Sequence, residues 1–278
     1  MEIWKSIILG VVEGLTEFLP VSSTGHLTIT EKLLDLKIDD KGVTAFTAII
    51  QVGAILAAII YFWRDIVKFI GGLIGGLRSA EGRTTDGWRM GINVIVGSIP
   101  IAIVGLALKD VIEGTLRSLW FVAAGLVLWS LVMVVAEHLG TQRRHEDDVN
   151  WKDALIIGIV QCVALIPGVS RSGATISAGL LRGIDRVTAT RMSFFLGIPA
   201  LAAAGALEAA TSVKEIDATV GWPAVAVGTV VSFVVAYASI AWLLRFVANH
   251  SIVSFVWYRV ALGGVLVTLL ATATIAAT

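Results

Sequence analysis

The sequence predicts an all-α integral membrane protein, and three observations support this fold class. Hydrophobic residues make up 56% of the 278 positions, and the mean hydropathy is +0.87. Charged residues make up only 15%, whereas soluble domains are usually about one quarter charged. Several apolar stretches also approach the roughly 20 residues that a helix needs to cross the hydrocarbon core of a bilayer.

Six apolar stretches are predicted to be transmembrane helices. They cover residues 43–63, 90–108, 119–136, 192–210, 222–244 and 255–276. The net charge of zero gives no reason to expect a nucleic-acid partner. Cys162 is the only cysteine, which excludes an internal disulfide and a cysteine-based metal cluster.

Two further apolar segments, 5–30 and 152–181, are interrupted near their middle by 19-LPVSSTG-25 and 166-IPGVSRSG-173. Proline removes a backbone donor and Gly/Ser clusters favour turns, so a straight helix is disfavoured in both. We expect two re-entrant helix–loop–helix hairpins, because open backbone at membrane depth must be surrounded by protein or by a wet cavity. A kinked single span is the alternative.

The distribution of Lys and Arg predicts the orientation. Segments 64–89, 137–152 and 182–191 are expected in the cytoplasm because of Arg64, Lys68, Arg78, Arg83, Arg89, Arg143, Arg144, Lys152, Arg182, Arg186 and Arg191. The less basic loops are expected outside together with both termini; they are 31–42, 109–118 with Lys109 and Arg117, and 211–221 with Lys214. The first hairpin then enters from outside and the second from the cytoplasm.

The two hairpins align when the chain is shifted by 148 residues. The aligned pairs are Gly10 with Gly158, Glu13 with Gln161, Ser22 with Ser170, Thr24 with Ser172, and Gly25 with Gly173. Repeats 1–148 and 149–278 would each hold one hairpin and three spans within a single membrane domain. An odd number of crossings inverts the second copy, and broken helices of inverted repeats often meet near the midplane. We therefore expect the two polar loops to build one cavity.

Glu13 and Glu17 are four residues apart and share one face of a helix. Carboxylates at membrane depth are costly, so they indicate a functional site, with a salt bridge or a retained proton as the structural alternative. Acids of this kind can hold Mg²⁺ or Ca²⁺ against a diphosphate. Two carboxylates are too few ligands without substrate or water.

The loop 21-VSSTG-25 offers the hydroxyls of Ser22, Ser23 and Thr24, and its amides are expected to open a helix beginning near His26. Such amides favour a phosphate, with ordinary helix capping as the alternative. His26 is the only histidine inside an apolar segment; it is a candidate acid, base, nucleophile or polar cap. The other three are expected to be solvated: His138, His145 and His250.

The second loop, 167-PGVSRSGAT-175, places Arg171 between Ser170 and Ser172, with Thr175 as a further donor. A guanidinium group matches phosphate oxygens in a bidentate manner. Pairing of Arg171 with a carboxylate of the first hairpin is the alternative, and both arrangements can hold in turn if substrate displaces the carboxylate. Together the two loops predict phosphoryl transfer on a substrate that enters from the bilayer.

At these residues the sequence resembles the undecaprenyl-diphosphate phosphatase family of the bacitracin-resistance type. The resemblance rests on 13-EGLTEFLPVSSTGH-26 and 167-PGVSRSGATIS-177, where both family motifs are complete. It implies an enzyme of the bacterial cytoplasmic membrane that needs a divalent cation and whose site opens to the outer side. Such enzymes hydrolyse undecaprenyl diphosphate to undecaprenyl phosphate and inorganic phosphate. The reaction recycles a lipid carrier for cell-wall synthesis and gives bacitracin resistance.

The resemblance also assigns roles to the motif residues. Glu17, Ser23, His26 and Arg171 are the expected catalytic core, with Glu13 and Glu17 as metal ligands. The predicted substrate-binding residues are Ser22, Thr24, Gly25, Ser170, Ser172, Gly173 and Thr175. Ser23 is the expected nucleophile, with His26 as its base or as acid for the leaving group. A His26 nucleophile and an activated water are the rivals.

Readings from other classes remain at this stage. Inverted repeats with buried charges also suit a transporter or flippase of a phosphorylated prenyl lipid. A lipid phosphatase of the phosphatidic-acid type is disfavoured, because 172-SGATISAGLL-181 supplies neither the His nor the Asp that such enzymes carry after the arginine. A structural membrane protein would not need two matched polar loops. The small residues of 71-GGLIGG-76 permit a homodimer without specifying one.

Overall fold

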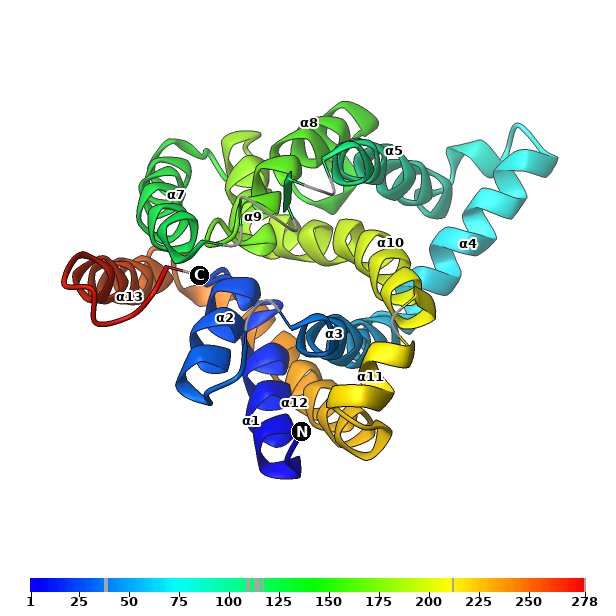
Figure 1. Cartoon of the computed structure of the whole chain (residues 1–278). Helices are drawn as coiled ribbons and strands as arrows, with labels where there is room; N and C mark the ends of the chain where they lie inside the picture. The colour runs from blue at the N-terminus through cyan, green and yellow to red at the C-terminus, as the bar shows by residue number, and fades with distance from the viewer. Residues whose placement is uncertain (38–39, 109–110, 113–115, 117, 212, 278) are drawn as a thin grey trace.

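The computed structural model describes residues 1–37, 40–108, 111–112, 116, 118–211 and 213–277, and these residues form helices and turns without a β-strand (Figure 1). Six helices are long and apolar enough to cross a membrane. They are α3 (Lys41–Tyr61), α5 (Asp86–Ala107), α7 (Leu119–Leu139), α10 (Arg186–Thr211), α12 (Trp222–Asn249) and α13 (Ser254–Ala271). The predicted all-α membrane fold with six spans is therefore confirmed.

The predicted span boundaries are least accurate where charged side chains lie inside a helix. α10 begins at Arg186, six residues before the predicted start of its span at 192. The reason is that Arg186 pairs with Glu137, while Arg191 lies 2.9 Å from Asp65 and 2.9 Å from Glu146. Hydropathy ends a span at the first charge, whereas the helix continues because its arginines find carboxylates at the edge of the bundle.

Each predicted hairpin segment forms a helix–turn–helix in which the chain reverses its direction. The first comprises α1 (Ile3–Thr16) and α2 (Ser23–Leu33), and the second α8 (Trp151–Gln161), η4 (Cys162–Leu165) and α9 (Arg171–Leu181). Lys5 in α1 donates to the carbonyl of Leu34 at 2.9 Å, just beyond α2. Arg182, just beyond α9, donates to Asp153 in α8 at 2.9 Å. These contacts bring the two ends of each segment together, as expected for a hairpin, while its re-entrant position in a membrane stays a prediction.

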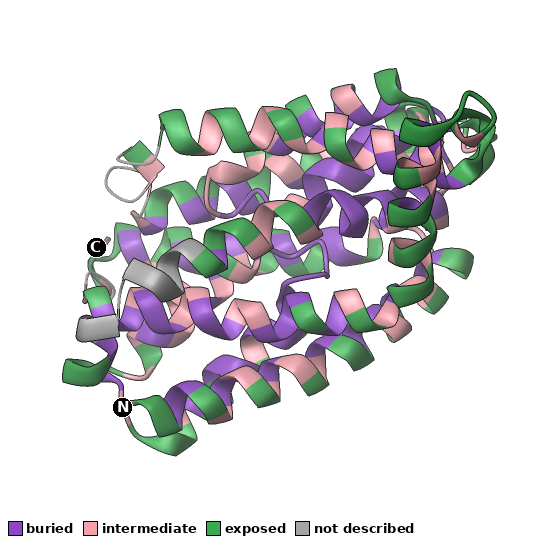
Figure 2. Ribbon diagram, turned by 90° about the vertical axis from the view of Figure 1, so that its right-hand side faces the viewer, coloured by how far each residue is buried: buried purple, intermediate pink, exposed green. Residues whose placement is uncertain are grey.

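The segments between the helices gather at two opposite ends of the bundle. At one end the amide of Leu119 donates to Ala277 at 2.8 Å, and both termini lie at this end in Figure 2. At the other end Arg89 lies 3.0 Å from Asp147, and we call this end the basic rim. The segments expected in the cytoplasm lie at the basic rim, while the assignment of this end to the cytoplasm stays a prediction. Lys109 and Arg117 lie outside the described residues.

Four shorter elements complete the described part of the chain. Three lie at the basic rim, namely α4 (Trp63–Arg78), η1 (Gly82–Thr84) and η3 (Glu146–Asp148), and α11 (Val213–Thr219) lies between α10 and α12. α4 stands at the edge of the molecule in Figure 1. The three predicted solvated histidines are exposed: His138, His145 and His250.

The two hairpins pack in equivalent ways, each against a helix of the other half of the chain. α1 lies along α12 and α8 lies along α5 (Figure 1). A Cβ atom added to Gly10 would lie 2.6 Å from the carbonyl oxygen of Gly228, and one added to Gly158 would lie 2.1 Å from that of Gly97. Only glycine permits such close backbone approach. Because Gly10 and Gly158 are aligned positions, these contacts agree with a two-fold arrangement, although the division at residue 148 stays a prediction.

Candidate active site

Both polar loops end in the same unusual helix cap. Ser22 precedes α2 with φ 77°, and Ser170 precedes α9 with φ 76°. Positive φ is strained for serine, at roughly 1–3 kcal/mol. Each side chain offsets part of that strain by accepting from the amide of the glycine three residues later, at 3.3 Å from Gly25 and 3.1 Å from Gly173. Because Ser22 caps α2, this helix begins at Ser23 and not near His26 as the sequence suggested.

The loops of the two hairpins contact each other directly. The amide of Gly168 donates to the Ser22 hydroxyl at 3.1 Å, and the Ser172 hydroxyl donates to the carbonyl of Leu19 at 2.8 Å. The structure therefore brings together the two motifs that lie about 150 residues apart in the chain. These serine side chains hold the loops to each other.

Several predicted substrate-binding groups are engaged within the protein. The hydroxyls of Ser170 and Ser172 lie 3.1 Å apart, and Thr175 donates to the carbonyl of Arg171 at 2.8 Å. Thr24 is exposed at the start of α2. The amides of Ser23 and Thr24 have no acceptor among the described residues, so they are the N–H groups of α2 that remain for an anion.

Glu17 is the centre of a polar cluster drawn from both hairpins. Its Oε2 atom accepts from the Ser23 hydroxyl at 2.7 Å and from the Gln51 amide at 3.3 Å. Its Oε1 atom lies 3.3 Å from Nη2 of Arg171. The Glu17 side chain is only 3% exposed, so little water screens these interactions. From the sequence, pairing of Arg171 with a carboxylate of the first hairpin was the alternative to phosphate binding, and the structure shows such an ion pair with Glu17.

Arg171 is held in a space that a glycine leaves open. Its Nη1 donates to the carbonyl of Ser193 at 2.8 Å, and its buried Nε has no partner among the described residues. A Cβ atom added to Gly197 would lie 2.2 Å from Nη1 of Arg171. The guanidinium group thus keeps one donor free, and its position depends on the absence of a side chain at residue 197.

Glu13 is fully buried, and neither carboxylate oxygen has a partner among the described residues. The amide of Glu17 donates to the carbonyl of Glu13 at 2.9 Å, so helical geometry continues through both acids. Gln161, at the aligned position of the second hairpin, is equally buried and equally unpartnered. A buried unpaired carboxylate is costly, which favours a ligand or cation beside Glu13.

His26 does not face Ser23 in this structure. Its Nδ1 lies 2.7 Å from the carbonyl oxygen of Ser22, and its Nε2 lies 2.5 Å from the hydroxyl of Tyr258. Ser23 donates to Glu17 instead. The arrangement therefore favours Glu17 over His26 as the group that accepts the serine proton.

Sequence reasoning missed three polar residues inside predicted spans: Gln51, Tyr258 and Arg259. Arg259 is fully buried and donates to Ser130 at 3.1 Å. It also donates to four carbonyl groups, those of Pro20 at 2.9 Å, Gly125 at 3.2 Å, Gly168 at 2.9 Å and Val169 at 3.1 Å. An arginine within an apolar span was the available signal, because such a charge is retained only where it has partners.

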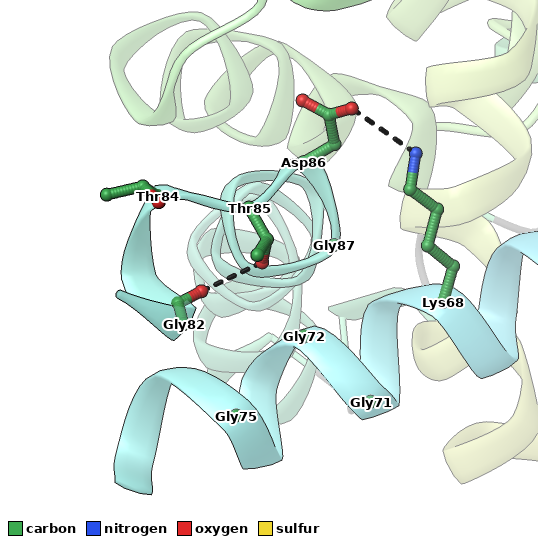
Figure 3. A pocket seen from close by; sticks show the side chains of 9 residues that line it. All are labelled: Lys68, Gly71, Gly72, Gly75, Gly82, Thr84, Thr85, Asp86 and Gly87. Atoms are coloured by element: carbon green, nitrogen blue, oxygen red, sulfur yellow. Dashed lines mark hydrogen bonds and ion pairs between the residues drawn. The ribbon is translucent and has the colours of Figure 1, made fainter. Parts of the chain in front are cut away.

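A hollow near the surface lies away from this cluster. It measures about 570 Å³, lies between α4 and the start of α5, and is lined largely by glycines (Figure 3). Lys68 and Asp86 at its edge neutralise each other at 3.4 Å. None of its lining residues belongs to either motif, so the buried polar cluster is the better candidate for the chemistry.

The fold and the cluster together define a multi-pass membrane protein with a buried acid–serine–arginine site suited to phosphoryl chemistry. Residues 6–265 match the family model described as bacitracin resistance protein BacA, and the chain belongs to this family. It is 60% identical to undecaprenyl-diphosphatase 3 of Frankia casuarinae over 278 residues, which is 100% of both chains. It is 56% identical to the undecaprenyl-diphosphatase of Acidothermus cellulolyticus, over 92% of both chains. It is 52% identical to that of Cutibacterium acnes, over 95% of this chain and 96% of the relative.

Proposed function

We propose that this protein is an undecaprenyl-diphosphate phosphatase, which hydrolyses undecaprenyl diphosphate to undecaprenyl phosphate and inorganic phosphate. The observation that carries the proposal is the contact of Glu17 with both Ser23 and Arg171, which unites the two motifs around one carboxylate. The names of full-length relatives support the same reaction. The transporter reading has no comparable support, because transport does not require a serine hydrogen-bonded to a buried carboxylate.

Ser23 is the proposed nucleophile. Its Oγ atom attacks the terminal phosphorus, and Oε2 of Glu17 accepts the hydroxyl proton, for which a 2.7 Å hydrogen bond is already present. A bond forms between Oγ and phosphorus while the bond from phosphorus to the bridging oxygen breaks, so undecaprenyl phosphate leaves. Water then hydrolyses the phosphoserine, which restores Ser23 and releases inorganic phosphate.

Arg171 and the start of α2 are the proposed phosphate-binding groups. When the diphosphate enters, the Arg171 guanidinium exchanges its contact with Glu17 for the phosphate oxygens, which frees the carboxylate to act as base. The amides of Ser23 and Thr24 supply further donors at a helix N-terminus. His26, once protonated on Nε2, is the proposed proton donor to the leaving group, and it is not proposed to activate Ser23.

A divalent cation, Mg²⁺ or Ca²⁺, is proposed as cofactor, with Glu13 and Glu17 as the residues that would hold it. The unpartnered oxygens of Glu13 fit a hard cation, which prefers carboxylate ligands. The described residues contain no group of three or more His, Cys, Asp or Glu suited to a metal, so water or substrate must complete the ligand set. When bound, the cation would neutralise charge on the diphosphate.

The proposed location is the bacterial cytoplasmic membrane, with the site open to the outer side. The gathering of arginines at the basic rim supports this orientation, because basic loops stay in the cytoplasm. The products would then return the lipid carrier to cell-wall synthesis, and lower exposure of the diphosphate lipid would give bacitracin resistance. A homodimer remains a prediction from the glycines of α4.

The test is phosphate release from undecaprenyl diphosphate in detergent by the purified protein and by Glu17→Ala. We expect release by the wild type and a loss of about 10²–10⁴-fold in the variant. Glu81→Ala, which removes an exposed carboxylate at the basic rim, is the matched control and should behave as wild type. Equal release by wild type and Glu17→Ala would contradict the proposed role of Glu17, and no release by the wild type would contradict the phosphatase itself.

A further inference from the structure

Helix α13 carries no residue of either motif, yet it is hydrogen-bonded to both polar loops. Arg259, in the second turn of α13, donates to the carbonyls of Pro20 in the first loop and Gly168 in the second. Among the described residues, the hydrogen bonds of Arg259 go to four backbone carbonyls and to the hydroxyl of Ser130. Because five hydrogen bonds fix this residue, its neighbours on α13 are held in a constant position relative to the loops.

The residue before Arg259 contacts the catalytic histidine. The hydroxyl of Tyr258 lies 2.5 Å from Nε2 of His26, and the two rings are stacked with centroids 5.5 Å apart and planes inclined by 15°. Both a directional hydrogen bond and ring packing therefore restrain His26. Tyr258 is 49% exposed, so its hydroxyl is held by this contact and not by burial.

The partners of His26 determine which ring nitrogen carries the proton in the neutral form. The carbonyl oxygen of Ser22 can only accept, so Nδ1 of His26 is the donor in the 2.7 Å contact with it. Nε2 is then the acceptor, and the Tyr258 hydroxyl donates to it. Nε2 is therefore the nitrogen that must take up a proton before His26 can act as an acid, and Tyr258 is the group that orients it.

We propose that Tyr258 is a positioning residue for the phosphatase reaction: it holds the imidazole ring of His26 in one orientation and in a single tautomer. This inference rests on the proposed function, because it assigns His26 a role in that reaction. Tyr258 acts through His26 and does not touch the phosphate. Its removal should therefore impair the chemical step without weakening the binding of the lipid.

The test compares Tyr258→Phe with Trp257→Phe in detergent with undecaprenyl diphosphate. Trp257 is the adjacent residue on α13 and is 77% exposed, so the control makes a similar aromatic change away from the site. We expect Tyr258→Phe to lower kcat about tenfold with KM unchanged, below the roughly 10²–10⁴-fold that a general acid or base itself contributes. Trp257→Phe should leave both constants unchanged.

A second readout follows the hydrogen bond itself. The chain has four histidines, so the imidazole ¹⁵N spectrum of histidine-labelled protein is simple, and a His26→Gln variant assigns the His26 signals. Tyr258→Phe should shift the His26 Nε2 resonance and leave the signals of the other three histidines in place. A purely structural role for Tyr258 would lower thermal stability without this selective shift and without a separate loss of kcat.

The inference is overturned if Tyr258→Phe retains the kcat of the wild type, or if it raises KM alone. An equal loss of kcat in Tyr258→Phe and Trp257→Phe also overturns it, because the loss would then follow from any aromatic change on this part of α13 and not from the contact with His26. Absence of phosphate release by the wild type would instead contradict the proposed function. In that case the ¹⁵N shift alone decides whether Tyr258 orients His26.

Discussion

Ser23 donates a 2.7 Å hydrogen bond to Glu17, although six residues and the break between two helices separate them in the chain. This contact places a hydroxyl beside a buried carboxylate, which is the arrangement that an activated serine nucleophile requires. From the sequence, His26 was a candidate both as base for Ser23 and as acid for the leaving group, and this contact assigns the first role to Glu17. Glu17 faces the serine, whereas His26 faces Tyr258.

Replacement of Arg171 should remove the main phosphate-binding cation. Arg171→Ala is expected to lower kcat/KM by about 10²–10³-fold, because the charge that develops on the phosphate loses its preorganised donor. Arg245→Ala is the matched control, since Arg245 is an exposed arginine near the end of α12. Steady-state phosphate release measures both. An Arg171→Ala enzyme with the wild-type kcat/KM would exclude this residue from phosphate binding.

A methyl group at residue 197 should displace Arg171 without touching it chemically. In Gly197→Ala the new Cβ atom would lie 2.2 Å from Nη1, far inside van der Waals contact, so the guanidinium group must move. We expect kcat/KM to fall about tenfold or more, since a misplacement near 1 Å can cost on the order of 10²-fold.

Gly105→Ala is the control for that change, because a Cβ atom added at Gly105 meets nothing within 4 Å. Both substitutions add one methyl group to a glycine inside a membrane helix, α10 or α5. Equal activities of the two variants would show that the position of Arg171 does not depend on Gly197.

Removal of divalent cations should abolish phosphate release, and addition of Mg²⁺ or Ca²⁺ should restore it. Glu13→Gln should raise the cation concentration needed for half-maximal activity by about tenfold, because a neutral amide is a weaker ligand than a carboxylate. The measurement is a cation titration of chelated enzyme. Full activity in chelator would contradict the proposed cofactor, and an unchanged titration curve in Glu13→Gln would remove Glu13 from the ligand set.

Arg259 should contribute to stability through the loop carbonyls that it binds. Arg259→Met keeps much of the side-chain volume but leaves five acceptors without their donor. Each unsatisfied buried acceptor costs about 1–3 kcal/mol, so we expect a clear drop in Tm in detergent. Arg245→Met is the control. A Tm equal to that of wild type would mean that other contacts hold the two loops together.

The features predictable from the sequence are those that depend on neighbouring residues. Apolar runs locate the six spans, and proline with Gly/Ser clusters locates the breaks at 19–25 and 166–173. The start of α10 is capped locally by Asp185, which accepts from the amide of Thr188 at 3.0 Å. What could not be predicted is the ion pair of Arg186 with Glu137, because Glu137 is distant in the chain.

The residue types of the site were predictable from the sequence, but the contacts between them were not. The motif residues indicated an acid, a serine, a histidine and an arginine, yet which of them touch depends on how α1, α9 and α13 pack. Tyr258 and Arg259 give no periodic signal, because they are adjacent polar residues in an otherwise largely apolar helix. Their partners, His26 and the loop carbonyls, come from segments more than 80 residues away.

Ser23 is proposed to attack the terminal phosphate of undecaprenyl diphosphate, and trapping the phosphorylated enzyme is the direct test of this step. The protein is mixed with substrate, quenched within the first turnover, digested and mapped by mass spectrometry under conditions that preserve both phosphoserine and phosphohistidine. We expect phosphate on Ser23 in the wild type and none in Ser23→Ala. Phosphate on His26, or rapid turnover by Ser23→Ala, would contradict it.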